Sequence, residues 1–317
     1  MKNKDKYREF CRVESTIPIF SQDWWLDAVV GEEHWDVALV EENNEIIASL
    51  PYMIKKKPFI KYISMPMLTQ TAGIWIRYPL GQKYMDRLSF EKEIFNKIID
   101  NLPKVDYFSQ NFHYSFTNWL PFYWRGFSQT TRYTYVIEDL TDLDKVYREF
   151  DRSKKKDIKK ALKQVKVGFD LSAREFYENH KLTLSKQGQK ISYPFDVFER
   201  IYNSVYSRKA GRIIWAKDNH GHLHSALFVI WDGQSAYDLI STIDPDYRNS
   251  GSATLLILEI IKYIADKTRK FDFEGSMIET VERSFRKFGA VQKPYFKITK
   301  TYSKLLKIRG VINEVLK

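Results

Sequence analysis

The stretch that decides the fold is Tyr247-Arg248-Asn249-Ser250-Gly251-Ser252-Ala253, which is followed by an apolar run from Thr254 to Ala265. A turn rich in Ser, Asn and Gly therefore leads into a helix that is apolar on nearly all faces, as expected for a helix buried against a sheet. One strand candidate, Ser235 to Ser241, precedes the turn, and another, Phe271-Asp272-Phe273, follows the helix. The turn is predicted to lie at a strand-to-helix junction.

Such a junction favours a bound anion, because the first free N–H groups of the helix point outward and the helix dipole adds to them. Small residues let the backbone approach a phosphate, and an arginine supplies a positive charge. The predicted anion-binding residues are Arg248, Asn249, Ser250, Gly251, Ser252 and Ala253. These six residues alone also fit an ordinary loop with a Ser N-cap.

Composition limits the number of domains and the class of protein. A chain of 317 residues with 44% hydrophobic residues is large enough for about two domains. The single cysteine, Cys11, excludes an internal disulfide framework and a Cys-based zinc site. The net charge of +11 favours anionic partners such as nucleic acid, phosphorylated metabolites or an anionic membrane face. No apolar run reaches the roughly 20 residues that span a bilayer, and the charged N-terminus lacks a signal core. We therefore expect a cytoplasmic protein that could still touch a membrane surface.

The order of the elements predicts the architecture. Residues 141–299 read as helices, a three-stranded meander, a helix, a strand, a helix and a strand. The first 140 residues repeat this order loosely, with a helix at Gln22–Val30, a hairpin, more strands, a helix at Phe90–Asn101 and a strand. We predict an α/β (α+β) chain with domains at 1–140 and 141–317, each a mixed, mostly antiparallel sheet flanked by helices. The last helix, 302–317, could pack back on the first domain.

The charge run from Arg152 to Lys163 predicts a helix that is basic on most faces, with Arg152 and Lys156 on one face. It is either a solvated helix or a cationic wall for phosphates. The part from Lys154 to Lys163 contains no aromatic residue, which counts against specific reading of RNA bases.

Several motifs resemble a known family. The spacing Arg248-x-x-Gly251-x-Ala253 resembles the pyrophosphate-binding signature of the GNAT acyltransferases, (Gln/Arg)-x-x-Gly-x-(Gly/Ala). Two such halves in one chain resemble the FemAB-like (methicillin-resistance protein) family. The segment from Phe271 to Ser276 resembles its Tyr/Phe-Asp-Phe-x-Gly strand end. The segment from Phe285 to Ala290 resembles its Phe-Lys-x-x-Phe-Gly motif, here one residue shorter with Arg286 nearest the Lys position. The match covers the second half well and the first half by pattern.

The resemblance implies tandem GNAT-like domains and N-acyl transfer. Some family members transfer amino acids from aminoacyl-tRNA to peptidoglycan precursors, and others resemble acyl-CoA N-acyltransferases of envelope pathways. This chain lacks the long coiled-coil arm of some tRNA-using members, so we favour acyl-CoA (acetyl-CoA) over aminoacyl-tRNA as the donor. The acceptor would be an amine of a small molecule or cell-envelope precursor, with anionic character, in a cleft between the domains. Arg152, Lys156, Arg286 and Lys287 would hold a phosphorylated acceptor or the donor's ribose phosphate.

Acyl transfer to an amine needs a proton acceptor and a dipole that polarises the acyl carbonyl. A backbone N–H on the strand before Arg248 could polarise the carbonyl. Asp238 and Glu274 lie at predicted strand ends and are the candidate bases, acting through water. The structural alternative is that Asp238 faces solvent and Glu274 caps a turn. Tyr237 is a candidate to protonate a leaving thiolate.

Two alternatives to this enzyme site are a metal site and a protein without catalytic activity. His222 and His224 alternate on a strand but have no evident third ligand, so we predict no metal site. The rival to the enzyme is a catalytically inactive GNAT-like protein that binds RNA or another polyanion, which the positive charge would suit.

Overall fold

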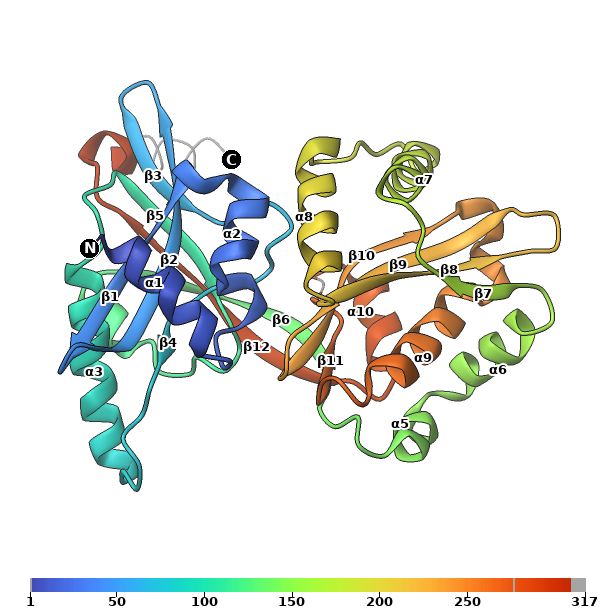
Figure 1. Cartoon of the computed structure of the whole chain (residues 1–317), viewed down its shortest axis with the longest axis horizontal. Helices are drawn as coiled ribbons and strands as arrows, with labels where there is room; N and C mark the ends of the chain where they lie inside the picture. Colours follow the sequence, from blue (N-terminus) through green and yellow to red (C-terminus); the bar gives the residue numbers. More distant parts are fainter. Residues whose placement is uncertain (1, 276, 309–317) are drawn as a thin grey trace. The chain divides into compact units, whose positions relative to one another are not determined.

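The structure is a computed structural model that describes residues 2–275 and 277–308 (Figure 1). The chain forms two compact units. Unit 1 contains the described residues up to Arg132 and from Pro294 onward, and unit 2 is Tyr133–Lys293.

Unit 1 consists of helices, a meander, a longer helix and returning strands (Figure 1). Strands β1, β2 and β3 pair antiparallel in sequence order, β5 then pairs parallel to β3, and β12 pairs antiparallel to β5. Its elements are α1 (Asn3–Val13), η1 (Ile19–Ser21), α2 (Asp23–Val30), η2 (Glu32–His34), β1 (Trp35–Glu42), β2 (Glu45–Lys57), β3 (Ile60–Ser64), β4 (Trp75–Ile76), α3 (Tyr84–Asp100), β5 (Tyr107–Phe112), α4 (Leu120–Trp124) and the start of β6 (Ser128–Ile137).

Unit 2 repeats this plan. Strands β8, β9 and β10 form an antiparallel meander, β11 pairs parallel to β10, and the end of β6 pairs antiparallel to β11. Its elements are α5 (Leu143–Glu149), α6 (Arg152–Ala161), β7 (Lys166–Phe169), α7 (Ala173–Lys186), α8 (Phe195–Ser207), β8 (Gly211–Lys217), β9 (Leu223–Trp231), β10 (Ser235–Ile243), η3 (Pro245–Ser250), α9 (Ser252–Ile264), β11 (Lys270–Asp272), α10 (Glu279–Arg286) and the start of β12 (Val291–Thr301).

The predicted fold class is confirmed. In each unit a three-stranded meander leads to a helix, α3 or α9, and then to a strand parallel to the last meander strand. Helix α9 is buried as its sequence predicts: Leu256, Ile260, Ile261 and Ile264 are fully buried in the core of unit 2. Each such side chain contributes roughly 1.5–3 kcal/mol of hydrophobic burial.

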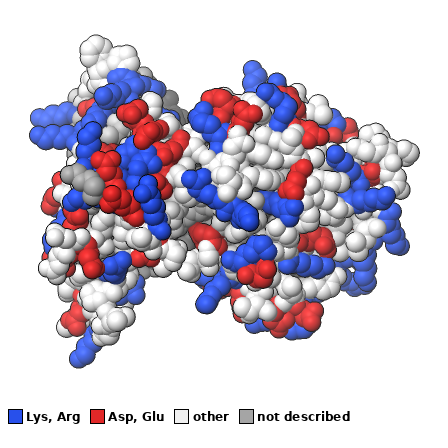
Figure 2. All heavy atoms as spheres, in the orientation of Figure 1, with Lys and Arg blue, Asp and Glu red and all other residues white. Residues whose placement is uncertain are grey.

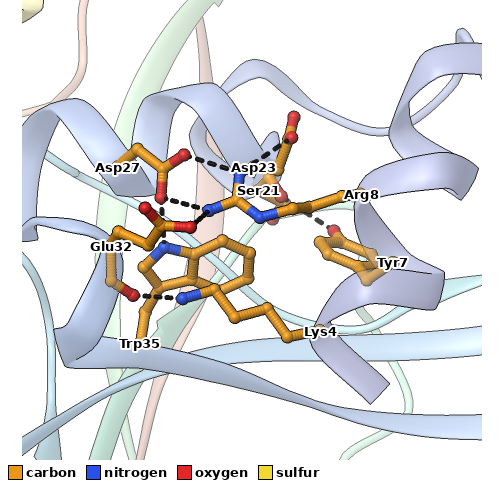
Figure 3. Close-up of polar contacts among 8 residues, drawn as sticks. All are labelled: Lys4, Tyr7, Arg8, Ser21, Asp23, Asp27, Glu32 and Trp35. Atoms are coloured by element: carbon orange, nitrogen blue, oxygen red, sulfur yellow. Dashed lines mark hydrogen bonds and ion pairs between the residues drawn. The ribbon is translucent and has the colours of Figure 1, made fainter. Parts of the chain in front are cut away.

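Helix α1 was missed by the sequence analysis, which treated this segment as a charged terminus. Its apolar side is narrow: Tyr7 is the one buried residue on it, and Phe10 and Cys11 are partly buried against the same hydrophobic cluster. Polar contacts also hold it to α2 and to the short helices η1 and η2 (Figure 3). The Arg8 guanidinium reaches Asp27 at 2.6 Å, Asp23 at 3.3 Å and Glu32 at 3.1 Å. The Tyr7 hydroxyl donates to the Ser21 carbonyl oxygen at 2.7 Å.

Three smaller predictions from the sequence are wrong: an N-cap at Thr141 for the helix 144–150, a cap at Ser21 for the helix 22–30, and a loop at 116–127. Helix α5 is capped by Asp142, which accepts from the Lys145 backbone N–H at 2.8 Å, and not by Thr141. Ser21 belongs to the short helix η1 and makes no capping bond to α2. The segment 116–127, predicted as a loop, contains α4. Most of the predicted helix 302–317 lies outside the described residues.

Candidate functional site

The candidate site begins where β10 and β11 separate. The two strands pair in parallel for three residues, and the last pair is Tyr237 with Asp272. Strand β10 also carries a bulge: Asp238 lies opposite Val229 and Ile240 lies opposite Phe228, so the residue between them has no partner on β9. Bulges re-aim side chains and interrupt pairing, often beside active sites. Three carboxyl groups occupy this place, and we call Asp238, Asp272 and Glu274 the carboxylate fork.

Asp238 is buried, which excludes the solvent-facing alternative. The Ser241 hydroxyl donates to its Oδ2 at 2.7 Å. Its Oδ1 is buried and has no hydrogen-bond partner among the described residues. Burial penalises the charged form and raises the pKa of Asp238 to about 6. At neutral pH this carboxyl is mostly ionised yet poised to take up a proton.

Asp272 was not predicted as a site residue. It is buried in β11, accepts a hydrogen bond from the Thr134 hydroxyl, and accepts another from the Glu274 backbone N–H at 2.8 Å. Burial raises the pKa of Asp272 to about 7. The available signal was an acid between two phenylalanines, Phe271 and Phe273, both of which are buried.

Glu274 completes the fork in an uncommon backbone conformation. Its φ is +56°, and the next residue, Gly275, has a φ of +68°. A Cβ on Gly275 would clash with the Tyr133 carbonyl oxygen, so glycine permits a close approach to β6 there. The Glu274 Oε1 atom is buried without a hydrogen-bond partner in the described part of the chain. Burial, and then the charges of Asp272 and Asp238, raise the pKa of Glu274 well above its usual value.

Burial thus raises the pKa of every acid in the fork, and the charges of Asp272 and Asp238 raise the pKa of Glu274 further. Asp238 is the candidate to accept a proton, and Glu274 is the candidate to donate one. Neighbouring titratable groups whose pKa values are pushed apart are a common arrangement for acid–base chemistry. Tyr237 is buried and in register with Asp272, so the structure brings the three predicted catalytic residues to one strand junction.

The predicted anion-binding turn lies directly after β10. It is the short helix η3, followed by Gly251 with a φ of +78° and then α9. A Cβ on Gly251 would clash with the Asp157 carbonyl oxygen of α6, so glycine here serves helix packing. Ser250 and Ser252 are buried and bonded to each other at 2.9 Å between their hydroxyl oxygens. Ser225 donates to Ser252 at 2.9 Å. Ser250 and Ser252 therefore stabilise the turn and do not face solvent.

Other groups of the turn remain available to an anion. Arg248 and Asn249 are exposed, and no ion pair is recorded for Arg248 within residues 2–275 and 277–308. Because the Ser252 N–H bonds to Ser250 Oγ at 3.2 Å, the next donors of α9 are the backbone N–H groups of Ala253 and Thr254. The first turn of α9 contains no acidic residue. The positive end of the helix dipole is therefore not offset by an acidic side chain in the first turn of α9.

The turn is held from both sides. The Lys186 ammonium reaches Asp244 at 2.7 Å and Asp246 at 2.6 Å. The His224 ring stacks on Tyr247 with ring centroids 4.0 Å apart. On the described ranges, no group of three or more His, Cys, Asp or Glu residues is placed to hold a metal ion.

The predicted basic residues gather on α6 and the end of α10. Arg152 and Lys156 are exposed on α6, and the Lys160 ammonium donates to the Asn249 carbonyl oxygen at 2.5 Å, which ties α6 to the turn. The Lys287 ammonium donates to Ser153 Oγ at 3.5 Å, while Arg286 lies 3.6 Å from Glu282.

The sequence analysis missed Lys154, which is buried inside the basic run. Its ammonium donates to Ser284 Oγ at 2.8 Å and lies 4.1 Å from the Phe288 ring centroid. Burial lowers the pKa of Lys154 to about 8. The available signal was its spacing. Lys154, Ile158 and Ala161 are four and three residues apart, so they lie on one face of α6, and all three are buried.

Comparison with known proteins identifies the fold of this site. Residues 147–278 match the family of the acetyltransferase (GNAT) domain. The matched residues all lie in unit 2 and run from α5 through the turn and β11 past the carboxylate fork. No curated protein matches the chain.

Solved structures extend the likeness to both units. The chain resembles FemX with a TM-score of 0.66 at 12% identity, covering 92% of this chain and 95% of FemX. It resembles a tandem GNAT protein from the clavulanic acid biosynthesis pathway with a TM-score of 0.53 at 8% identity, covering 94% and 95%. L-PGS from Bacillus licheniformis gives a TM-score of 0.52 at 9% identity, covering 98% and 96%. These likenesses confirm the tandem GNAT-like, FemAB-like fold. No helix among the described residues is long and apolar enough to cross a membrane.

Proposed function

We propose that this protein is an N-acyltransferase whose chemistry takes place in unit 2. The observation that carries the proposal is the carboxylate fork, where a bulged strand and a separating parallel pair gather buried acids with shifted pKa values. The GNAT domain match to this part of the chain supports acyl transfer as the general chemistry.

The roles follow from protonation. The amine of the acceptor attacks the acyl carbonyl, the carbonyl C–S bond breaks, and the proton released by the amine passes through water to Asp238. The backbone N–H at the β10 bulge would polarise the carbonyl, because the bulge leaves a residue outside the ladder. Tyr237, or Glu274 in its protonated form, would return a proton to the leaving thiolate. Asp272 would position Glu274 through the hydrogen bond it accepts from the Glu274 backbone N–H.

The donor's phosphates would lie on the turn. The exposed Arg248 and Asn249, with the N–H groups of Ala253 and Thr254, supply the charge and the hydrogen bonds. Gly251, Ser250 and Ser252 would shape this turn. Arg152, Lys156, Arg286 and Lys287 would contact a second phosphate of the donor or an anionic acceptor.

We favour acyl-CoA as the donor, and the family resemblance keeps aminoacyl-tRNA as the second choice. The acceptor would be an amine of a small molecule or of a cell-envelope precursor such as a peptidoglycan precursor. We also place the protein in the cytoplasm, where both donors are made.

A matched pair of substitutions tests the donor site. Ala253 lies in the first turn of α9, where an acid favours the helix dipole and should not weaken folding. Ala253→Asp would repel a phosphate, whereas Ala253→Asn has nearly the same shape without the charge. Calorimetry with coenzyme A and acetyl-CoA should show saturable binding by wild type and weaker binding by Ala253→Asn, because the larger side chain hinders the approach of a phosphate to the backbone. Affinity should fall at least about tenfold further in Ala253→Asp.

Three other results would change the proposal. Equal affinity of the two variants would show that the donor's phosphates do not bind at the turn. Binding of aminoacyl-tRNA in place of acetyl-CoA would change the donor but keep the transferase. Binding of neither donor, with salt-sensitive binding of RNA, would favour the inactive polyanion-binding alternative.

A further inference from the structure

The tip of the β2–β3 hairpin in unit 1 carries an aromatic ring that no described part of the molecule covers. Phe59 is 100% exposed, while the core residues at the base of the same hairpin are buried. Its φ is +67°, an uncommon conformation for a bulky side chain. The hairpin projects from unit 1, and Figure 2 shows its uncharged tip with lysine and arginine atoms directly below it.

Four lysines flank this ring, namely Lys55, Lys56, Lys57 and Lys61. Lys56 and Lys61 lie directly opposite each other in the ladder, an arrangement that destabilises a hairpin. No ion pair is recorded for any of the four in the part of the chain that the structure describes. The fold thus keeps two unfavourable features, a strained aromatic tip and an uncompensated lysine pair, at one place.

The lysines stand on both faces of the hairpin. Lys55 pairs with Tyr62 and Lys57 with Ile60, so these lysines share one face, while Lys56 and Lys61 occupy the other. Beside them lies a surface pocket of about 600 Å³, lined by all four lysines and also by Glu33 and Asp36. An anionic group in that pocket would meet more positive than negative side chains.

We propose that the β2–β3 hairpin is a docking element for an anionic lipid surface. Phe59 enters the boundary between the headgroups and the acyl chains, and the lysines on both faces contact lipid phosphates around it. A ring of charge around an apolar tip matches a surface that the hairpin enters end-on. A nucleic acid laid along one face would contact only half of the lysines. The proposal goes beyond acyl transfer and does not depend on it.

The test uses the full-length protein and sedimentation with lipid vesicles. One set contains phosphatidylcholine alone, and the other contains phosphatidylcholine with phosphatidylglycerol. We expect binding to the anionic vesicles that weakens with salt and is nearly absent with neutral vesicles.

Two variants should weaken this binding without harming the fold. Phe59→Asn suits the left-handed backbone better than phenylalanine and removes the ring. Lys56→Glu places an acid opposite Lys61, a favourable cross-strand pair, and removes a lipid-facing charge. Since a lysine near an anionic membrane contributes about 1 kcal/mol, we expect at least a roughly fivefold loss for Lys56→Glu. Thermal unfolding should show unchanged or higher midpoints for both.

Matched controls lie elsewhere. Leu80→Ser removes another fully exposed apolar side chain, and Lys190→Glu makes the same charge change in unit 2. Neither should change vesicle binding. The proposal is overturned if the two hairpin variants bind anionic vesicles as wild type does, if the controls lose binding equally, or if the hairpin variants lose only oligonucleotide binding.

Discussion

The two units differ at the place where a pair of parallel strands separates. In each, a parallel strand pair separates after a short ladder, at Ile63–Phe108 in unit 1 and at Tyr237–Asp272 in unit 2. In unit 1 the chain itself fills the gap: the Ala72 N–H donates to the Asn111 carbonyl oxygen at 2.7 Å, and the His113 N–H donates to the Ala72 carbonyl oxygen at 2.9 Å. In unit 2 the described residues place the carboxylate fork there.

The side chains at the two strand junctions also differ between the units. Relative to the last ladder pair, the positions of Asp238, Asp272 and Glu274 correspond to those of Ser64, Phe108 and Gln110 in unit 1. Gln110 is buried, and its amide donates to the Pro51 carbonyl oxygen at 3.0 Å. A neutral, occupied junction suits a scaffold, and an acidic one suits proton transfer. The comparison supports our proposal that catalysis takes place in unit 2 and that the corresponding place in unit 1 has a structural part.

The largest effect should come from the proposed base. Asp238→Asn keeps the shape of the side chain but cannot accept the proton from the amine, so kcat should fall about 10²- to 10⁴-fold. Ser64→Ala, at the corresponding position of unit 1, should leave kcat unchanged. Release of thiol from acetyl-CoA in the presence of an accepted amine measures both. An unchanged rate in Asp238→Asn would remove this residue from the mechanism.

The next effect concerns the turn. Gly251 and Gly81 both have positive φ, at +78° and +70°, but of the two only Gly251 has a neighbouring backbone within 4 Å of the position that a Cβ would occupy. Gly251→Ala should therefore cost roughly 3 kcal/mol or more, because strain and a backbone clash add together. Gly81→Ala should cost only about 1 kcal/mol, from its backbone conformation. Chemical denaturation of both variants checks this, and equal losses would show that α6 packing does not require the glycine.

A third effect is a pH dependence of stability. The pKa values of Asp238 and Asp272 are raised to about 6 and about 7, so the native state holds protons that the unfolded state has already released. The stability gained from these protons is complete below about pH 4 and is lost as the pH rises through 6 and 7. The free energy of unfolding should therefore fall between about pH 4 and pH 8.

Asp272→Asn tests the origin of that fall. An asparagine oxygen can still accept the hydrogen bonds from Thr134 and from the Glu274 N–H, but it does not titrate. The variant should lose less stability than wild type over the same pH range, by about 1.4 kcal/mol for each unit of pKa shift removed. Parallel pH curves for the two proteins would contradict the assignment.

The smallest effect lies in unit 1. The Asn111 amide donates to the Gln70 carbonyl oxygen at 3.0 Å and helps to hold the segment that fills the junction. Asn111→Ala should lower the free energy of unfolding by about 1 kcal/mol and leave kcat and donor affinity unchanged. A large loss of activity in this variant would break the division between the two junctions.

Sequence periodicity was sufficient for the meander of unit 2, the buried helix α9 and the fold class, because apolar side chains repeat there at the strand and helix periods. It missed α1, whose apolar side is limited to the buried Tyr7 and the partly buried Phe10 and Cys11, and whose attachment also depends on polar groups such as Arg8.

The candidate site was predictable only in outline. Asp238 and Glu274 stood at strand ends in the sequence, but their pKa shifts arise from burial and from Asp272, which a strand pattern does not reveal. The role of Gly251 also differs from a simple reading of its motif, because the residue it meets, Asp157, is distant in the sequence.

One measurement tests the central claim most directly: hydrogen–deuterium exchange of the full-length protein with and without saturating acetyl-CoA. The account predicts slower exchange in the stretch from β10 through the first turn of α9, residues 235–255, and unchanged exchange in the corresponding stretch of unit 1, residues 60–87. Protection of residues 60–87 without protection of 235–255 would contradict the assignment of the donor site to unit 2.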